Sequence, residues 1–352
     1  EVKIHSGLWM GISKDPLSEY YVEKETGDIV NDAVYNRNRA VEERLNVKFS
    51  HTWHETTWET RATELAFYTS SIMSGDDFFD IVFYIAHLMP SVALGGSMYN
   101  LADMEYIDLS QPWWAQLYNG AATVNGNLYF ATGDIVLGNY LNAYCMYFNH
   151  QLIGTLDMEN PYELVKNGKW TLETVRTMSA EAYSDLNGNA KADEGDRFGL
   201  VVQGGNIISG FMESSEVQIL EIADDGLSGE YVFANEHNTN VVQRVCKLLF
   251  ESEGVLYGKD GTADQYLFND GNVVFTGGWF SDTDYYRDLE FDYGVIPYPK
   301  YDENQDDYYT RMGTACPVVA VPVTTDAPDM ISAVLEVMAA EGYYQMRPAY
   351  FD

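Results

Sequence analysis

The first third of the chain alternates between strand and helix patterns, and this order narrows the possible folds more than any other feature. The segments "VKIHSGLWM" and "NVKFSHTWH" read as strands, and "NDAVYNRNRAVEERL" between them reads as an amphipathic helix opened by an Asn or Asp cap. A second helical stretch, "TWETRATELAFYTSSIMSG", leads to "FDIVFYI", an apolar run typical of a parallel strand buried on both faces. This βαβαβ order predicts an α/β lobe with a parallel sheet, whose ligands bind at the carboxyl ends of the strands.

A second lobe is expected after residue 134. The strand pattern "NAYCMYFNHQLI" follows "VNGNLYFATGDI", and further helices and strands run on to "FDYGVIPYPK", with Thr171 as the predicted cap of one helix. The late apolar run "CPVVAVPV" can cross back to the first lobe and is followed by a predicted helix from about Pro328 to Glu341. We therefore predict a first lobe of residues 1–134 with about 317–345, and a second lobe of residues 135–316.

Length and charge exclude several classes of partner. A chain of 352 residues can bury a large core and form two lobes. Its 54 acidic and 20 basic residues give a formal charge of -34, which argues against binding to nucleic acid or to anionic lipid. The longest apolar stretches are far too short for a membrane span. The three cysteines are an odd and sparse set, so free thiols are expected rather than a disulfide framework.

One acidic run, "DLNGNAKADEGD" at residues 185–196, has the spacing of a calcium loop. Calcium loops supply oxygen ligands from positions 1, 3, 5, 7, 9 and 12, the seventh through its backbone carbonyl. The predicted ligands are Asp185, Asn187, Asn189, the carbonyl of Lys191, Asp193 and Asp196. A bound Ca²⁺ would offset the repulsion between such closely spaced carboxylates. We expect a structural calcium ion, which would fix the corner between a helix and the strand "RFGLVV".

Two positions of this run depart from the usual hand-type calcium loop. Ala190 occupies the sixth place, where glycine normally makes the sharp turn, and the twelfth ligand is Asp196 instead of Glu. A solvated loop without metal is the alternative, because Asn, Asp and Gly also form ordinary turns. Weakly binding calcium loops work where calcium is abundant, outside the cell.

Several segments follow one another in a characteristic order: "GDDFFDIVFYIAH", "VNGNLYFAT", "YCMYFNHQLI", "KWTLETV", "FNDGNVVFTGGWF", "DYGVIPYPK" and "CPVVAVPV". In this order they resemble the extracellular solute-binding proteins of the maltose-binding superfamily, family 1, which are receptor subunits of ABC importers. The likeness is strongest to the lipoprotein branch of Gram-positive gut bacteria, through "YNRNRAVEERL", "PYELVKNGKWT", the DxNGN loop and "PYPKYDENQ". It covers nearly the whole chain. Members of that branch usually continue beyond the equivalent of Asp352, so a C-terminal segment is expected to be missing here.

The resemblance implies the two-lobed α/β fold of type II periplasmic binding proteins, with a mainly parallel sheet flanked by helices in each lobe. It also implies a hinge that closes both lobes on a ligand in the cleft between them. The expected ligand is a carbohydrate, and the expected partner is an ABC transporter permease. A monomer held outside the cell by a lipid anchor, without enzymatic activity, completes this expectation.

Aromatic side chains at strand ends are the candidate sugar contacts. Trp9, Trp53 and Tyr84 are read as the ends of the first three strands, and an aromatic face can cover the apolar C–H face of a sugar. By the resemblance, Tyr84 and His87 match a segment whose aromatic residue contacts sugar. Trp279 matches a position at which relatives stack tryptophan on the ligand, and Gly277 and Gly278 before it would allow close approach of the backbone. Asp134 can bind hydroxyls or cap its turn.

Other readings of these residues and of the function stay open. Packing explains Trp113, Trp114 and Trp170 better than binding does, and Trp58 is as well suited to a core as to a ligand contact. A receptor for a peptide or another polar solute would use the same lobes. A glycoside-active enzyme would need two carboxylates around the scissile bond, and the chain carries no HExxH, GxSxG or GxxxxGK[ST] motif.

Overall fold

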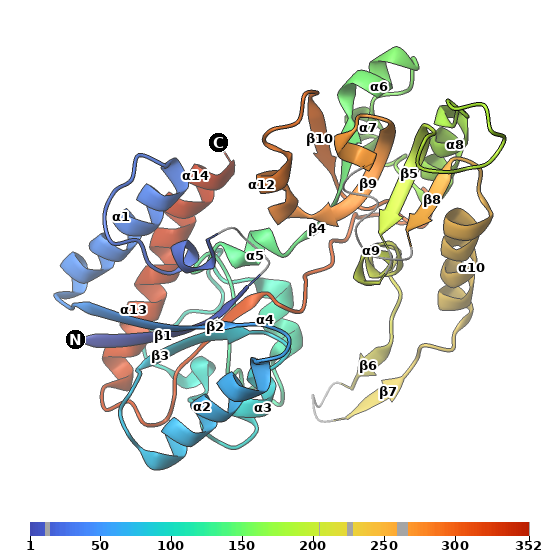
Figure 1. The fold of residues 1–352 in the computed structure, drawn as a ribbon. Coiled ribbons are helices and arrows are strands. Elements are labelled where there is room, and N and C mark those ends of the chain that lie inside the picture. Colours follow the sequence, from blue (N-terminus) through green and yellow to red (C-terminus); the bar gives the residue numbers. More distant parts are fainter. Residues whose placement is uncertain (11–14, 204, 224–227, 259–266, 352) are drawn as a thin grey trace. The chain divides into compact units, whose positions relative to one another are not determined.

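The chain forms two compact units. The computed structural model describes residues 1–10, 15–203, 205–223, 228–258 and 267–351. The first unit contains residues 1–142 and 314–352, and the second contains residues 143–223 and 229–313 (Figure 1). The first unit is therefore built mainly from the two ends of the chain, and the second from its middle.

The first boundary lies after Asn142, later than the position after Asp134 that the sequence suggested. Ile135 and Val136 are fully buried in the main core of the first unit. Leu137 and Leu141 pack against the first long helix and against Met346. These four apolar side chains hold the segment on the first unit, which explains the shift.

The first unit is built on a four-stranded sheet with the order β11-β3-β1-β2. Strands β1 (Val2–Trp9), β2 (Phe49–Thr56) and β3 (Ile81–Ile85) are parallel, and α1 (Ile29–Leu45) and α2 (Arg61–Ser74) connect them. This arrangement confirms the predicted βαβαβ order. Strand β11 (Pro317–Ala320) pairs antiparallel with β3, so the sheet is mixed at that edge.

Helices cover both faces of this sheet. Figure 1 shows α1 and α2 on opposite sides of β1, and α13 (Pro328–Glu341) lies on the α1 side. Side chains alternate along a strand, so Val2, Ile4 and Leu8 join the core below α1 and α13. The intervening residues His5, Gly7 and Trp9 point to the α2 side, where His5 lies against Tyr68.

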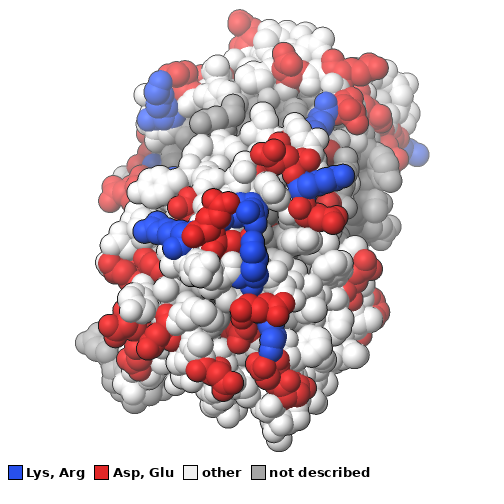
Figure 2. All heavy atoms as spheres, turned by 90° about the vertical axis from the view of Figure 1, so that its left-hand side faces the viewer, with Lys and Arg blue, Asp and Glu red and all other residues white. Residues whose placement is uncertain are grey.

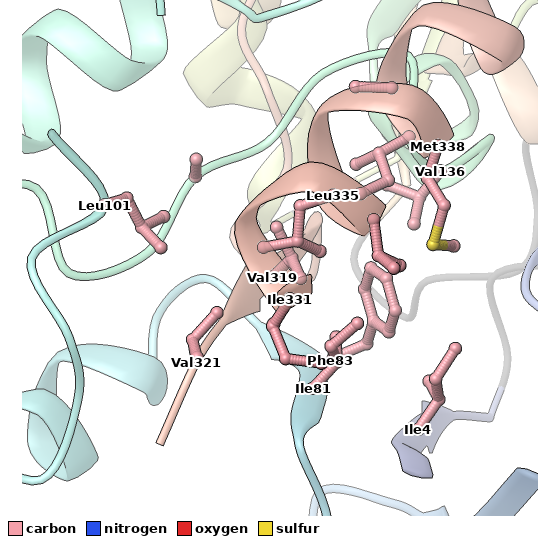
Figure 3. Close-up of a cluster of buried hydrophobic side chains, with 14 of the residues drawn as sticks. Ile4, Ile81, Phe83, Leu101, Val136, Val319, Val321, Ile331, Leu335 and Met338 are labelled. Atoms are coloured by element: carbon pink, nitrogen blue, oxygen red, sulfur yellow. The ribbon is translucent and has the colours of Figure 1, made fainter. Parts of the chain in front are cut away.

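The main core of the first unit joins α13 to the strands. Ile331, Leu335 and Met338 recur at helical spacing on one side of α13 and point toward Phe83 and Val319 (Figure 3). All five side chains are at most 1% exposed. Burial of one such side chain contributes roughly 1.5–3 kcal/mol. This core fixes the strands whose carboxyl ends carry the candidate site.

Local signals set the helix ends. The Asp28 carboxylate accepts hydrogen bonds from the backbone N–H groups of Val30 and Asn31, so it caps α1 a few residues before the Asn or Asp that the sequence suggested. Thr171 caps α8 (Leu172–Ala182) through the N–H of Thr174, which confirms its predicted role. Gly75 ends α2 in the left-handed region with φ of 67°.

The second unit is built on a five-stranded sheet with the order β10-β4-β9-β5-β8. Strand β5 (Phe198–Gln203) is parallel to β8 (Val255–Gly258) and β9 (Val273–Trp279). Strand β4 (Tyr144–Asn149) is antiparallel to β9 and to β10 (Tyr293–Ile296). Four of the five strands therefore run in one direction and β4 alone runs against them, in agreement with the expected mainly parallel sheet. An apolar run buried on both faces has the same pattern in either direction, so the sequence does not reveal the reversal of β4.

Helices α8, α9 (Asn206–Ser214) and α10 (Glu236–Glu251) pack on the second sheet through a shared core that includes Trp170, Val245 and Phe275. Trp170 is fully buried and donates its indole N–H to the carbonyl of Pro297, which confirms the packing role expected for it. The remaining elements are short: η1 (Pro16–Glu19), α3 (Met89–Ala93), η2 (Leu101–Asp103), α4 (Gln116–Ala122), α5 (Gly138–Leu141), α6 (His150–Thr155), α7 (Pro161–Lys166), β6 (Leu220–Ile222), β7 (Gly229–Tyr231), η3 (Phe280–Asp282), α12 (Thr283–Tyr286), η4 (Gly342–Met346) and α14 (Arg347–Phe351).

The three cysteines agree with the expectation of free thiols. All three cysteines are free; Cys145 and Cys316 are buried, and Cys246 is exposed on α10. Within the described ranges, every helix is too short or too polar to cross a lipid bilayer. On the face in Figure 2, acidic side chains are spread widely and the basic ones lie among them, without a continuous basic stripe.

Candidate functional site

The carboxyl ends of β1, β2 and β3 form one edge of the first unit, because the three strands are parallel. Strand β1 ends at Trp9, as predicted. His87 follows β3 by two residues, and Trp58 lies between the end of β2 and the start of α2. The fold therefore gathers three ring side chains at the edge where ligands bind in such sheets.

These rings and one arginine form the Trp58 cluster, which we define as Trp9, Trp58, Arg61 and His87. The rings of Trp58 and His87 are stacked, with centroids 6.1 Å apart and planes 27° apart. Trp9 meets His87 edge-on at 6.1 Å. The guanidinium carbon of Arg61 lies 3.7 Å from the Trp58 ring centroid, within cation–π range. Trp58 is 59% exposed, so these contacts hold a large indole in solvent.

His87 supplies a hydrogen-bonding group inside the Trp58 cluster. Its Nδ1 lies 3.1 Å from the carbonyl oxygen of Thr314. A carbonyl only accepts, so Nδ1 carries the proton and Nε2 of the neutral ring is an acceptor. Nε2 is buried and has no hydrogen-bond partner among the residues that the structure describes. A hydroxyl donor from a ligand would satisfy it.

Two predicted contacts of the first unit lie outside this cluster. Tyr84 is fully buried; its hydroxyl donates to the carbonyl of Arg61, and its ring fills the space beside Gly7. It is therefore part of the core beneath the cluster and not a ligand contact. Trp53 is 42% exposed, but it lies within β2 instead of at its end. It pairs with Ser6, whose side chain points away from the α2 side, so Trp53 and Trp9 lie on opposite faces of the sheet.

Asp134 is also separate from the Trp58 cluster. It is 6% exposed, accepts a hydrogen bond from the Tyr140 hydroxyl and lies 3.8 Å from the guanidinium of Arg347. Burial raises the pKa of this carboxyl, and the Tyr140 hydrogen bond and Arg347 oppose the rise. These contacts tie Asp134 to α5 and α14, which favours a structural role.

The second unit carries the Trp279 cluster, which we define as Trp279, Tyr144, Arg311 and Glu213. Trp279 is the last residue of β9, half-buried, and lies opposite Tyr144 in the sheet, with ring centroids 5.5 Å apart. Arg311 lies over the Tyr144 ring at 5.3 Å and is ion-paired with Glu213. The cluster thus combines two aromatic rings with a donor and an acceptor of hydrogen bonds.

The backbone around Trp279 is held on both sides. Its N–H donates to the Asp282 carboxylate at 3.0 Å, and its carbonyl accepts from the Tyr147 hydroxyl at 2.6 Å. A Cβ at Gly277 would lie 2.4 Å from the Tyr298 hydroxyl, and one at Gly278 would lie 2.3 Å from the Asp282 carboxylate. The two glycines therefore make room for packing within the unit and not for the ligand approach that the sequence suggested.

Residue Glu213 differs from an ordinary surface carboxylate. Burial raises its pKa, while the charge of Arg311 and its hydrogen bond oppose the rise. The side chain of Arg311 is 16% exposed, and the carboxyl side chain is 46% exposed. The pair is thus open to solvent mainly through Glu213. Neither residue was singled out from the sequence, because arginine and glutamate have no local signature of ligand binding.

The loop at residues 185–196 joins α8 to β5, as predicted, and a bridge between Ser184 and Arg197 closes its base. Asp185 accepts from the N–H groups of Gly188 and Ala190 at 2.6 and 2.9 Å. The sixth-place residue, Ala190, has a left-handed φ of 58°. This is the turn that glycine usually makes at the sixth place of a calcium loop.

The other oxygen side chains of the loop also face its own backbone. The Oδ1 of Asn187 accepts from the N–H of Asn189 at 3.0 Å, and the Oδ1 of Asn189 accepts from the N–H of Lys191 at 2.8 Å. The side-chain NH₂ groups of both asparagines donate to the Asp193 carboxylate. Asp196 is 1% exposed and accepts from the N–H groups of Leu186 and Asp193. Each accepting oxygen keeps a second lone pair. The oxygen donors thus fit the hard ligand set that Ca²⁺ prefers.

The two-unit α/β architecture is similar to the fold of solved structures that include an ABC substrate-binding protein and a maltotriose-binding protein. The chain is similar to UspC of M. tuberculosis, with a TM-score of 0.65, 16% identity and coverage of 100% of this chain and 84% of that one. It is also similar to an ABC substrate-binding protein of Listeria monocytogenes in complex with cycloalternan, with a TM-score of 0.58 and 12% identity. That match covers 96% of this chain and 74% of the Listeria protein.

A third neighbour is the maltotriose-binding protein of Thermus thermophilus bound with maltotriose, with a TM-score of 0.56 and 12% identity. That match covers 99% of this chain and 80% of the Thermus protein. No protein-family model and no curated protein matches the chain in sequence. At these identities the likeness concerns the fold, and at this level it confirms the resemblance seen in the sequence.

Proposed function

We propose that this protein is the extracellular substrate-binding subunit of an ABC importer, which captures a carbohydrate and delivers it to the permease. The observation that carries the proposal is the Trp58 cluster, an exposed indole held by Arg61 and His87 at the carboxyl edge of the sheet. A flat aromatic face suits the C–H face of a sugar, and His87 Nε2 suits a hydroxyl. The sugar-bound neighbours with the same fold add support.

The Trp279 cluster is proposed as a second sugar-contacting surface. Its two aromatic rings and the pair of Arg311 and Glu213 provide both stacking faces and charged hydrogen-bonding groups. The fixed backbone of Trp279 lowers the entropy lost when a ligand packs on its ring. Binding without bond cleavage is the proposed activity, in keeping with neighbours that are binding proteins.

The loop at residues 185–196 is proposed to hold a structural Ca²⁺ through Asp185, Asn187, Asn189, the Lys191 carbonyl, Asp193 and Asp196. Support comes from the left-handed turn at Ala190 and from the ring of side-chain oxygens on one short loop. The ion would offset the repulsion between the three aspartates. A monomer held at the cell surface by a lipid anchor is proposed on the likeness to the lipoprotein branch alone.

A thermal-shift screen tests the function. The protein is melted with linear and cyclic gluco-oligosaccharides, with monosaccharides and with short peptides, and the sugar mixtures are then assayed for products. A ligand at a hundred times its Kd stabilises the folded state by about 2.7 kcal/mol. A rise in Tm with a sugar and no products supports the receptor. A response to peptides alone, or release of smaller sugars, would overturn it.

A further inference from the structure

His5, His54 and Glu64 converge on the α2 side of the first sheet, and none of them belongs to the Trp58 cluster. His5 belongs to β1, His54 to the edge strand β2 and Glu64 to α2. His5 Nε2 lies 3.1 Å from one carboxylate oxygen of Glu64, and His54 Nδ1 lies 2.8 Å from the other. One donor atom from each residue lies within 4.8 Å of the others, so a single ion can reach all three.

We propose that these three residues bind a transition-metal ion, with Zn²⁺ as the best match. Two imidazole nitrogens and a carboxylate oxygen are a common ligand set for zinc, whereas calcium and magnesium prefer oxygen alone. Tetrahedral zinc with bonds of about 2.0–2.2 Å separates its ligand atoms by roughly 3.3 Å. The nitrogen–oxygen distances of 3.1 and 2.8 Å approach that separation, so small rotations of the side chains admit the ion.

The second nitrogen of His5 has a partner that suits a metal ligand. Its Nδ1 lies 2.8 Å from the Oγ1 of Thr52. When Nε2 binds a metal, Nδ1 carries the proton and donates it to this hydroxyl, which fixes the ring and its tautomer. Thr52 and His54 are two residues apart on β2, so both point to the same side of the sheet.

The surroundings hold the ligands in place and leave one side open. The His5 ring is packed between four aromatic rings, those of Phe67, Tyr68, Phe78 and Phe79, with centroids 5.1 to 6.0 Å away. The side chains of His5 and Glu64 are 0% and 4% exposed, and that of His54 is 47% exposed. Solvent or a fourth ligand can therefore approach the ion beside His54.

Binding exchanges protons for the metal. In the metal-free arrangement both ring nitrogens that face Glu64 are placed to donate N–H bonds to its carboxylate. Zn²⁺ takes the lone pair of each of those nitrogens, so the proton there must leave. A neutral ring takes up a proton on its other nitrogen and changes tautomer, whereas a ring protonated on both nitrogens releases one proton to solvent. No redox change occurs. The ion would join β1, the edge strand β2 and α2 at one point.

Zinc titration of the untagged, full-length chain tests the proposal. The protein is stripped with chelator, saturated with Ca²⁺ to occupy the loop at 185–196, and titrated with ZnCl₂ by calorimetry. We expect one Zn²⁺ per chain and, with Co²⁺, the intense visible bands of four-coordinate cobalt with nitrogen ligands. His54→Ala, at a half-exposed position, should weaken binding by at least about tenfold, and Thr52→Val by roughly tenfold.

Controls separate this site from other histidines and from folding effects. His237→Ala, which removes a ring bonded to the Ser215 carbonyl in the second unit, should bind zinc as the unaltered protein does. Circular dichroism confirms that each variant is folded. Absence of zinc binding, a six-coordinate cobalt spectrum, or unchanged affinity in His54→Ala would each overturn the proposal.

Discussion

The guanidinium carbon of Arg61 lies 3.7 Å from the ring centroid of Trp58, three residues earlier. Arg61 is the first residue of α2, and its carbonyl accepts the hydroxyl of the buried Tyr84. The core beneath the edge therefore fixes the start of the helix, and the start of the helix fixes the exposed indole. Recognition residues held this way lose little freedom on binding.

Replacement of this indole should weaken sugar binding. We expect Trp58→Ala to raise the Kd for a responding sugar by at least about tenfold, equivalent to about 1.4 kcal/mol, because tryptophan dominates many binding surfaces. Stability should change little, since the ring is 59% exposed. Calorimetric titration measures the Kd. The matched control is Trp53→Ala, on the other face of the sheet; an equal loss there would contradict the assignment.

Trp279 offers an independent test in the second unit. Trp279→Ala should abolish the sugar-induced rise in Tm, because it removes the ring opposite Tyr144 at the end of β9. Trp279→Phe keeps an aromatic face and should retain part of the response. Differential scanning fluorimetry with and without sugar compares the two variants. A full response in Trp279→Ala would remove this residue from the site.

The βαβαβ order of the first unit could be predicted because its signals are local. The amphipathic pattern of α1 and the apolar run of β3 lie within the segments that they define. The directions of β4 and β11 depend on pairing between residues far apart in the chain, which local patterns do not encode. The position after which the chain leaves the first unit was missed for the same reason.

The candidate site was only partly predictable. Trp9 lies at a strand end, where the pattern placed it, and Trp279, which was singled out by the resemblance, is the last residue of β9. Tyr84 was read as a strand-end sugar contact. Every residue of β3 is buried, so no polar alternation in the sequence showed which face its ring takes. Trp58 lies just before a helix, where core and surface positions look alike in sequence. His5 and His54 come together only through the register of β1 and β2.

The acidic loop leads to a test of calcium. Asp185→Ala should remove the difference in Tm between calcium and chelator, because this carboxylate is the first predicted ligand and also accepts two backbone N–H groups. Sugar binding should stay largely intact. Ala190→Gly is the matched change: it relieves a left-handed φ of 58° and should raise stability by about 1 kcal/mol with calcium still bound.

Thermal melts in calcium and in chelator measure both loop variants. An unaltered protein whose Tm does not respond to calcium at all would refute the calcium proposal, whatever the variants do. A lower Tm for Ala190→Gly would show that the backbone at the sixth place is not strained.

Glu19 lies buried in η1 beside Gly138, with 5% exposure, and burial raises its pKa to about 8. In the unfolded chain this pKa is near 4.5, so between the two values the unfolded state binds fewer protons and stability falls as pH rises. The contribution of the neutral Glu19 carboxyl to the free energy of unfolding is complete below pH 4.5 and lost by about pH 8. Glu19→Gln keeps the shape of the neutral carboxyl but cannot ionise. Between pH 5 and pH 8.5 the free energy of unfolding of this variant should therefore fall by a few kcal/mol less than that of the unaltered protein. Urea denaturation of both proteins at the two pH values measures this difference, and equal pH dependence would show that the Glu19 carboxyl does not titrate in this range.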